Sequence, residues 1–88
     1  MWITGHVVDD HGRPLSAVRI EALDAGARRR RAVVSNVRGE YVLQDLQPGE
    51  HTITFACAGF STVERKTDAL TTYVATVNAQ LIRRTGSA

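Results

Sequence analysis

Turn signals alternate with short apolar runs between residues 35 and 60 of this chain. The segments 36–39 and 48–49 can each reverse the chain, because they combine Asn, Pro and Gly in the order that turns require. Between them, Tyr41 and Leu43 lie two positions apart and therefore share one face of a strand. This pattern predicts two consecutive β-hairpins and a fold built from short strands.

The rest of the chain continues the same pattern. No segment shows the i, i+3, i+4, i+7 spacing of an amphipathic helix, whereas period-2 alternation recurs between turn signals. The predicted strands cover residues 2–8, 16–23, 29–35, 40–44, 50–58, 61–67 and 72–82. About seven strands with short turns favour an all-β sandwich of two antiparallel sheets. The sixth strand is polar and is predicted to be an edge strand.

Alternation also predicts which side chains face the core. The inward positions are Ile3, Gly5, Val7, Val18, Ile20, Ala22, Tyr41, Leu43, Ile53 and Phe55. Gly5 should leave room for a close neighbour, and His51 should pack at the start of its strand with its polar tip near water. Gly39 and Gly49 are expected to adopt positive φ in their turns.

Five short motifs follow one another along the chain: G-x-V-x-D at residues 5–9, G-x-P-L at 12–15, G-x-Y-x-L at 39–43, L-x-P-G at 46–49 and G-F at 59–60. In this order they resemble the carboxypeptidase regulatory-like domain, a transthyretin-like (prealbumin-like) β-sandwich. The resemblance implies one domain over residues 1–82, and residues 83–88 are expected to be a flexible tail or linker. It also implies a module without catalytic activity of its own.

Length and composition exclude several classes of protein. The 88-residue chain is long enough for one small core, and it contains neither an apolar run of membrane-spanning length nor a signal-peptide pattern. Direct membrane insertion is therefore not expected. The strand pattern starts at Trp2, as it would in a domain taken from a longer protein. Cys57 is the only cysteine, so an internal disulfide is excluded, and it is interpreted as a core thiol.

The sequence offers little that could support catalysis. Its four serines, at positions 16, 35, 61 and 87, stand in no nucleophile motif. His6, Asp9, Asp10 and His11 could form a surface metal cluster, but a solvated loop explains them more simply. We therefore predict no catalytic, cofactor-binding or metal-binding residue, no cofactor and no enzymatic activity.

Ligand binding is the remaining chemical possibility. The candidate ligand-binding residues are Trp2, Tyr73, Arg28, Arg29, Arg30 and Arg31. The two aromatics could stack on carbohydrate and the arginines could attract anions, but no aromatic residue interleaves with the arginines, which argues against nucleic-acid binding. A solvated loop and strand start is the simpler interpretation of the arginine run, and a packing role at the sheet edge is the simpler one for Trp2.

The resemblance implies a setting as well as a fold. Members of this family are accessory modules, so the leading hypothesis is a structural or interaction module of a larger extracytoplasmic bacterial protein. Such a module could be an N-terminal extension of a TonB-dependent outer-membrane receptor or a repeat in a surface protein. A carbohydrate-binding-like module and an accessory domain of a metallocarboxypeptidase are the alternatives. The expected partners are other domains of the parent protein, with carbohydrate as the alternative ligand, and the isolated domain is expected to be monomeric.

Overall fold

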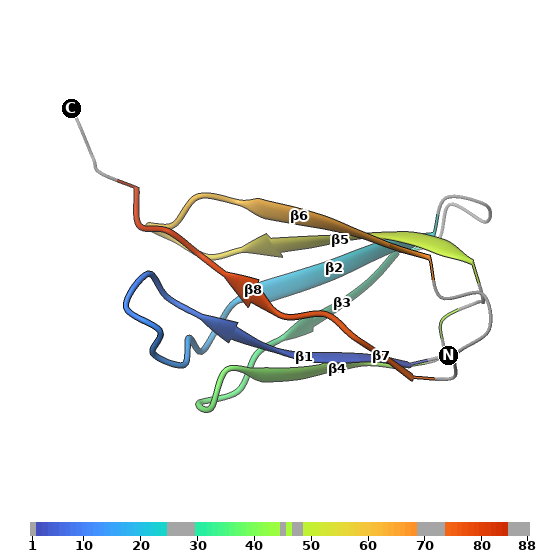
Figure 1. Ribbon diagram of the computed structural model, residues 1–88, viewed down its shortest axis with the longest axis horizontal. Coiled ribbons are helices and arrows are strands. Elements are labelled where there is room, and N and C mark those ends of the chain that lie inside the picture. Colours follow the sequence, from blue (N-terminus) through green and yellow to red (C-terminus); the bar gives the residue numbers. More distant parts are fainter. Residues whose placement is uncertain (1, 25–29, 45, 47–48, 69–73, 85–88) are drawn as a thin grey trace.

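The computed structural model describes residues 2–24, 30–44, 46, 49–68 and 74–84. All regular elements in these ranges are strands (Figure 1). They are β1 (Trp2–Val8), β2 (Arg19–Asp24), β3 (Arg30–Val34), β4 (Glu40–Leu43), β5 (Glu50–Ala56), β6 (Val63–Asp68), β7 (Val74–Thr76) and β8 (Ala79–Gln80). The described residues include no helix that is long and apolar enough to cross a membrane.

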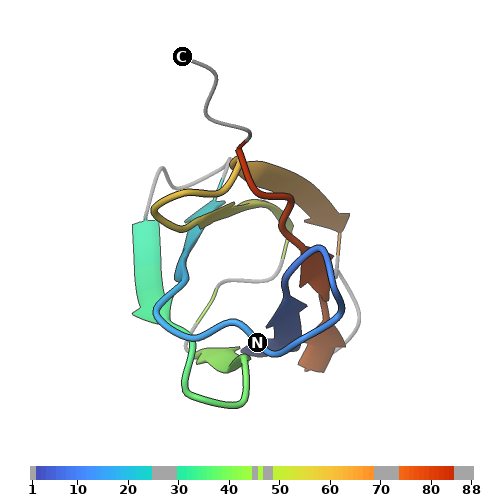
Figure 2. The same ribbon diagram turned by 90° about the vertical axis from the view of Figure 1, so that its left-hand side faces the viewer.

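The strands form two sheets that enclose the core (Figure 2). In the first sheet β1 lies between β4 and β7, and β8 also pairs with β1. The second sheet has the order β3-β2-β5-β6, and all its pairs are antiparallel. The predicted β-sandwich is confirmed, and β6 is an edge strand as expected.

The first sheet differs from the prediction in one respect. The expected last strand over 72–82 forms two short strands, β7 and β8, and both pair with β1 in parallel. Trp2 lies opposite Val74, and Val7 lies opposite Ala79. The sheet is therefore mixed, because its last strands run in the same direction as its first.

The prediction of two consecutive hairpins around residues 36–39 and 48–49 is wrong. β4 pairs with β1, whereas β3 and β5 both pair with β2, so each of these connections passes from one sheet to the other. The hairpins of the fold are β2-β3 and β5-β6. Ser35 helps to hold β3 in the second sheet, since its hydroxyl donates to the Leu15 carbonyl and accepts from the Val18 N–H.

The turn geometry at the first of these connections is as predicted. Gly39 has φ 73° and its N–H donates to the Asn36 carbonyl at 2.9 Å. The Asn36 side-chain oxygen accepts from the N–H groups of Arg38 and Glu40, both at 2.9 Å. Gly49 also has positive φ, at 135°, while Pro48 lies outside the described residues. Positive φ favours glycine, which explains both positions.

The core follows the predicted alternation closely. Its buried apolar residues are Ile3, Val7, Val18, Ile20, Ala22, Tyr41, Leu43, Leu46, Ile53, Phe55, Ala79 and Leu81. At its centre Phe55 and Tyr41 make an edge-to-face contact across the two sheets, with ring centroids 5.7 Å apart. Cys57, interpreted from the sequence as a core thiol, packs against this core but is only half-buried.

His51 is an exception to the predicted surface pattern. The sequence predicts that its polar tip lies near water, but the residue is fully buried. It lies on the inward face of β5, with Asp24 opposite on β2 and Thr67 opposite on β6. The inward face of β5 is buried from its first inward position onward, since His51, Ile53 and Phe55 are all fully buried.

The β1 ladder changes partners opposite Gly5. The Val77 N–H donates to the Thr4 carbonyl at 2.8 Å, as in a regular parallel pair, but the Val77 carbonyl accepts a hydrogen bond from the Tyr41 hydroxyl. The His6 N–H donates instead to the side-chain oxygen of Asn78, at 2.9 Å. Burial raises the pKa of the Tyr41 hydroxyl, which therefore stays protonated as a donor.

Gly5 makes this arrangement possible. A Cβ built at this position would lie 1.9 Å from the Val77 carbonyl oxygen and 2.9 Å from the Tyr41 ring. The prediction that Gly5 leaves room for a close neighbour is confirmed, and the neighbour is this inward-turned carbonyl.

Candidate functional site

The outer face of the first sheet carries Trp2, one of the exposed large apolar side chains of the described residues. Alternation along β1 directs Trp2, Thr4 and His6 outward, and Trp2 is 46% exposed. Thr4 lies opposite Val42 on β4 and opposite Thr76 on β7. The face therefore combines one aromatic ring with small apolar and polar side chains.

One end of this face is a polar cluster. His6 Nε2 lies 3.5 Å from Glu40 Oε2, and Glu40 Oε1 accepts a hydrogen bond of 3.3 Å from the Asn36 side chain. Both members of the His6–Glu40 pair are substantially exposed. The pair contributes little to stability, because exposed ion pairs are screened by water.

A hollow of about 700 Å³ adjoins the polar cluster. It is lined by Thr4, Gly5, His6, Val33, Val34, Asn36, Glu40, Tyr41, Val42 and Thr76. Trp2 does not line it. A sugar site normally places an exposed aromatic ring against its polar groups. The aromatic residue that lines the hollow is Tyr41, which is buried, so the lining offers no exposed ring for stacking and a sugar-binding role is disfavoured.

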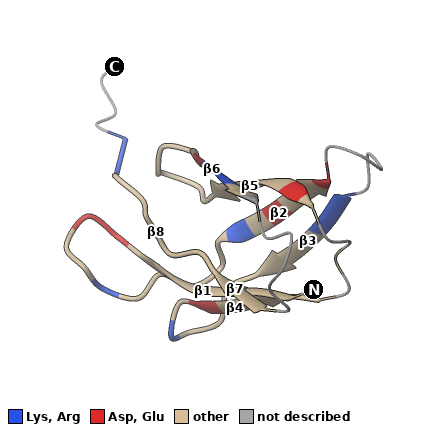
Figure 3. Ribbon diagram, turned by 45° about the vertical axis from the view of Figure 1, so that its right-hand side comes forward, with Lys and Arg blue, Asp and Glu red and all other residues tan. Residues whose placement is uncertain are grey.

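Two other candidate ligand-binding residues, Arg30 and Arg31, lie on the second sheet, whereas Trp2 lies on the first. Arg30 and Arg31 are exposed on β3, at the edge of the second sheet (Figure 3). Arg30 Nη1 lies 3.7 Å from Glu21 Oε1, and Arg19 Nη2 lies 3.3 Å from Glu21 Oε2. Part of the predicted positive charge is thus balanced locally. Tyr73, Arg28 and Arg29 lie outside the described residues.

The described residues do not assemble the metal cluster that the sequence suggested as an alternative. Within them, no three His, Cys, Asp or Glu side chains are placed to hold a metal ion. His6 faces Glu40, whereas Asp9 and Asp10 face Arg83. His11 Nε2 lies 3.9 Å from Asp10 Oδ1, so His11 belongs with the two aspartates and His6 lies apart from all three.

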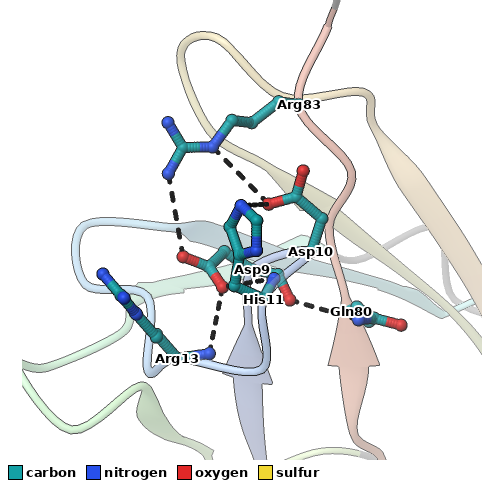
Figure 4. A network of polar contacts seen from close by, with 6 residues as sticks. All are labelled: Asp9, Asp10, His11, Arg13, Gln80 and Arg83. Carbon is teal, nitrogen blue, oxygen red and sulfur yellow. Dashed lines mark hydrogen bonds and ion pairs between the residues drawn. The ribbon is translucent and has the colours of Figure 1, made fainter.

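Asp9 organises the loop that follows β1 (Figure 4). Its Oδ1 atom accepts hydrogen bonds from the N–H groups of His11 and Arg13, at 2.8 and 2.9 Å. Its backbone carbonyl accepts a hydrogen bond from the Gln80 side chain at 3.2 Å. This aspartate closes the loop and attaches it to the carboxyl-terminal segment.

Arg83 completes the network in Figure 4 from the other end of the chain. Its Nη2 lies 3.8 Å from Asp9 Oδ2, and its Nε lies 3.5 Å from Asp10 Oδ1. Its guanidinium also lies 5.5 Å from the centre of the Phe60 ring. The sequence assigned Arg83 to a flexible tail; in the structure Arg83 and Arg84 are attached to the sandwich, and residues 85–88 lie outside the described residues.

Sequence reasoning missed the contacts of Asn78, Gln80 and Arg83. Asn78 and Gln80 left no distinctive signal, because they stand at the outward positions of the alternation over residues 75–81, where polar residues are ordinary. Arg83 left none either, since the pair Arg83-Arg84 after the last apolar position has the polar composition of a tail.

The pKa of Asp9 lies below its ordinary value. The hydrogen bond from the Arg13 N–H is the main cause, and partial desolvation of the carboxylate opposes it. A lowered folded-state pKa contributes stability that is present above the unfolded-state pKa of about 3.9 and is lost as the pH falls through the folded-state value. Asp9 therefore links acid titration to loop closure.

Replacing Asp9 by asparagine should test this link. Asp9→Asn retains an oxygen that can accept from His11 and Arg13 but loses the negative charge near Arg83. The variant is expected to be less stable than the wild type at neutral pH, and this difference should shrink as the pH falls below about 4. Urea unfolding at several pH values measures it, with Glu64→Gln on exposed β6 as the control for net charge. A difference that stays constant with pH would contradict the expectation.

Comparisons with known proteins identify a family for this chain and several structures with a similar fold. The family model of the carboxypeptidase regulatory-like domain matches residues 2–82. No curated protein sequence matches the chain. Among solved structures, the fold is similar to the Bacillus anthracis TIE protein, with a TM-score of 0.76 and 14% identity, covering 93% of this chain and 16% of that protein.

Two further structures show how widely this fold occurs. A streptococcal ancillary pilin superimposes with a TM-score of 0.74 and 12% identity over 94% of this chain and 32% of its own. Catechol 1,2-dioxygenase from Acinetobacter sp. ADP1 also gives 0.74, with 9% identity over 93% of this chain and 52% of its own. The chain thus spans less than a third of the first two proteins. At these identities the likeness concerns the fold alone.

Proposed function

Because the chain belongs to the carboxypeptidase regulatory-like domain family, we propose that it is a non-catalytic structural and interaction module of a larger extracytoplasmic bacterial protein. The observation that carries this proposal is the family match over residues 2–82, which includes every strand of the sandwich. The domain would contribute a stable scaffold to its parent, and chemistry would reside in other domains.

The polar contacts of the described residues support a scaffold. Asp9 closes the loop after β1, and Ser35 binds the segment that precedes β2. Tyr41 donates a hydrogen bond to the inward-turned carbonyl of Val77. Each of these groups uses its hydrogen bonds within the fold. Such groups increase stability, whereas a catalytic group must leave an atom available to substrate.

The proposed parent is a TonB-dependent receptor that carries the domain as an N-terminal extension, or a surface protein that carries it as a repeat. Sequencing the gene on both sides of the segment tests this. A plug domain and alternating barrel strands after Ala88 would support the receptor, and further sandwich repeats would support the surface protein. A zinc-peptidase domain before Met1 would replace both with the metallocarboxypeptidase alternative. A gene that encodes these 88 residues alone would contradict the proposal.

Carbohydrate binding is the second candidate, and the exposure of Trp2 beside Thr4 and His6 is the observation in its favour. We expect the isolated domain not to bind glycans or polyanions with a Kd below about 1 mM, which corresponds to about 4 kcal/mol. One exposed ring makes a poor stacking platform, and the exposed arginines give only salt-screened attraction, since the Debye length is about 8 Å at 0.15 M salt.

Calorimetric titration against a glycan panel and a polyanion at about 0.15 M salt checks this expectation. Trp2→Ala removes the ring, and Val37→Ala in the exposed 36–39 turn is the matched control for loss of apolar surface. Saturable binding that disappears in Trp2→Ala and persists in Val37→Ala would favour the carbohydrate-binding module over the scaffold.

A further inference from the structure

The first and last strands of the domain are parallel neighbours. β1 starts at Trp2, and its partners β7 and β8 are the last strands of the chain. In a parallel pair the two strands point the same way, so Trp2 lies at one end of the sandwich and Arg84 follows β8 at the other (Figure 1). Tension applied to these two positions would draw β1 and β8 past each other along their length.

We propose that this domain bears mechanical load, with β1 and residues 74–84 acting as a clamp that is loaded in shear. The inference rests on the proposed function, because tension reaches the domain only through a longer protein. Hydrogen bonds between strands run across the strand direction. Shear therefore loads all of them together, whereas a pull that separates the strands at one end breaks them in sequence.

The clamp contains bonds along its whole length. In addition to the paired residues of the ladder, Val77 donates to the Thr4 carbonyl at 2.8 Å and Leu81 donates to the Val8 carbonyl at 2.9 Å. The bond from the His6 N–H to the Asn78 side chain bridges the interval between β7 and β8. No stretch between Trp2 and Val8 is left without a connection to the carboxyl-terminal segment.

The clamp is reinforced by β4 and by the buried side chains beneath it. The Tyr41 hydroxyl binds the Val77 carbonyl, so β4 also resists sliding of the carboxyl-terminal segment. Under the clamp, Ile3, Val7 and Ala79 are buried and keep water from one face of the bonds. Water that cannot reach a strained hydrogen bond cannot replace it, which slows its rupture.

The segment that follows β8, residues 82–84, is attached to both sheets. Arg84 donates from its backbone to the Gly59 carbonyl at 2.9 Å, and the Ser61 N–H donates to the Ile82 carbonyl at 2.9 Å. Gly59 and Ser61 follow β5 of the second sheet, while Arg83 contacts Asp9 and Asp10 after β1 of the first. A pull on the carboxyl end is thus shared between the two sheets before it reaches β8.

Single-molecule force spectroscopy on the 88-residue chain tests the clamp by changing only the direction of pull. In the shear geometry the handles are attached at the two ends of the chain. In the peeling geometry one handle stays at the amino end and the other is attached to Val74→Cys, in a Cys57→Ala background used for both. Val74 is exposed and lies opposite Trp2, so this pull opens the same strands from one end.

We expect the lifetime at equal force to be at least about tenfold longer in shear, since several bonds must break together and forced unfolding follows the unfolding barrier. Tyr41→Phe should shorten the shear lifetime by about tenfold, because it leaves the partly buried Val77 carbonyl without its donor. It should change the peeling lifetime much less, and Val37→Ala should change neither.

Equal lifetimes in the two geometries would overturn the clamp, and so would an equal effect of Tyr41→Phe on both. This outcome is independent of the parent protein. A gene that encodes the domain alone would remove the source of tension without altering the measured anisotropy, so failure of the proposed function and failure of the clamp are distinguishable.

Discussion

Phe55→Ala is expected to lower the free energy of unfolding by about 3 to 5 kcal/mol, the usual cost of truncating a buried aromatic ring. Phe55 is fully buried in β5, and its ring meets the edge of Tyr41 from the other sheet. Removing it leaves a cavity between the two sheets that neither backbone can close. A domain of this size has a total stability of about 5 to 8 kcal/mol, so the variant should be close to unfolding at room temperature.

Urea denaturation followed by Trp2 fluorescence measures this loss through the transition midpoint. Val34→Ala is the matched control, because it also removes apolar atoms but Val34 is 62% exposed. A midpoint that does not change in Phe55→Ala would show that the inward face of β5 is misassigned.

Gly5→Ala should destabilise the domain by about 3 kcal/mol or more, at the upper end of the range for overpacking. The added methyl group would lie 1.9 Å from the Val77 carbonyl oxygen and 2.8 Å from its carbonyl carbon. Both are backbone atoms, so they can give way only if the carboxyl-terminal segment moves from β1. That movement would also separate Val77 from the Tyr41 hydroxyl.

Gly12→Ala separates the effect of space from the effect of backbone conformation. Gly12 has φ 77°, but a Cβ there would meet nothing within 4 Å. Its cost should be on the order of 1 kcal/mol, from the unfavourable φ alone. Thermal unfolding of both variants gives the comparison, and a Gly5→Ala variant no less stable than Gly12→Ala would contradict the close approach of Val77.

Alternation in the sequence was enough to assign faces. Tyr41 and Leu43 on β4, and Ile53 and Phe55 on β5, are buried as predicted. Side-chain period determines which face a residue occupies, but it carries no information about which strand lies alongside. Alternation and turn signals therefore predict hairpins around 36–39 and 48–49, although each of these connections joins the two sheets.

Burial of His51 could not be predicted for the same reason. Alternation places His51 on the inward face of its strand, but it does not tell how far toward the end of the strand that face is covered. Coverage depends on the packing between the two sheets, which a local pattern does not report.

The candidate site was predicted in part. Placement of Trp2 beside Thr4 and His6 on the outer face of β1 follows from alternation alone. The network around Asp9 depends on Arg83 and Gln80, which are more than 70 positions away in the sequence. No local pattern reports contacts at that separation, so the sequence could not connect the loop after β1 with the end of the chain.

The order of the strands also determines when the domain can fold during synthesis. The second sheet is complete at Asp68, whereas β1, which is made first, obtains its partners β7 and β8 only from the last described residues. Contacts between the two ends of a chain slow folding, because a long loop must close before they form. The edge of β1 that pairs with β7 and β8 must therefore remain unpaired until residues 74–84 have left the ribosome. A nascent chain halted before this segment exposes that strand edge to other chains.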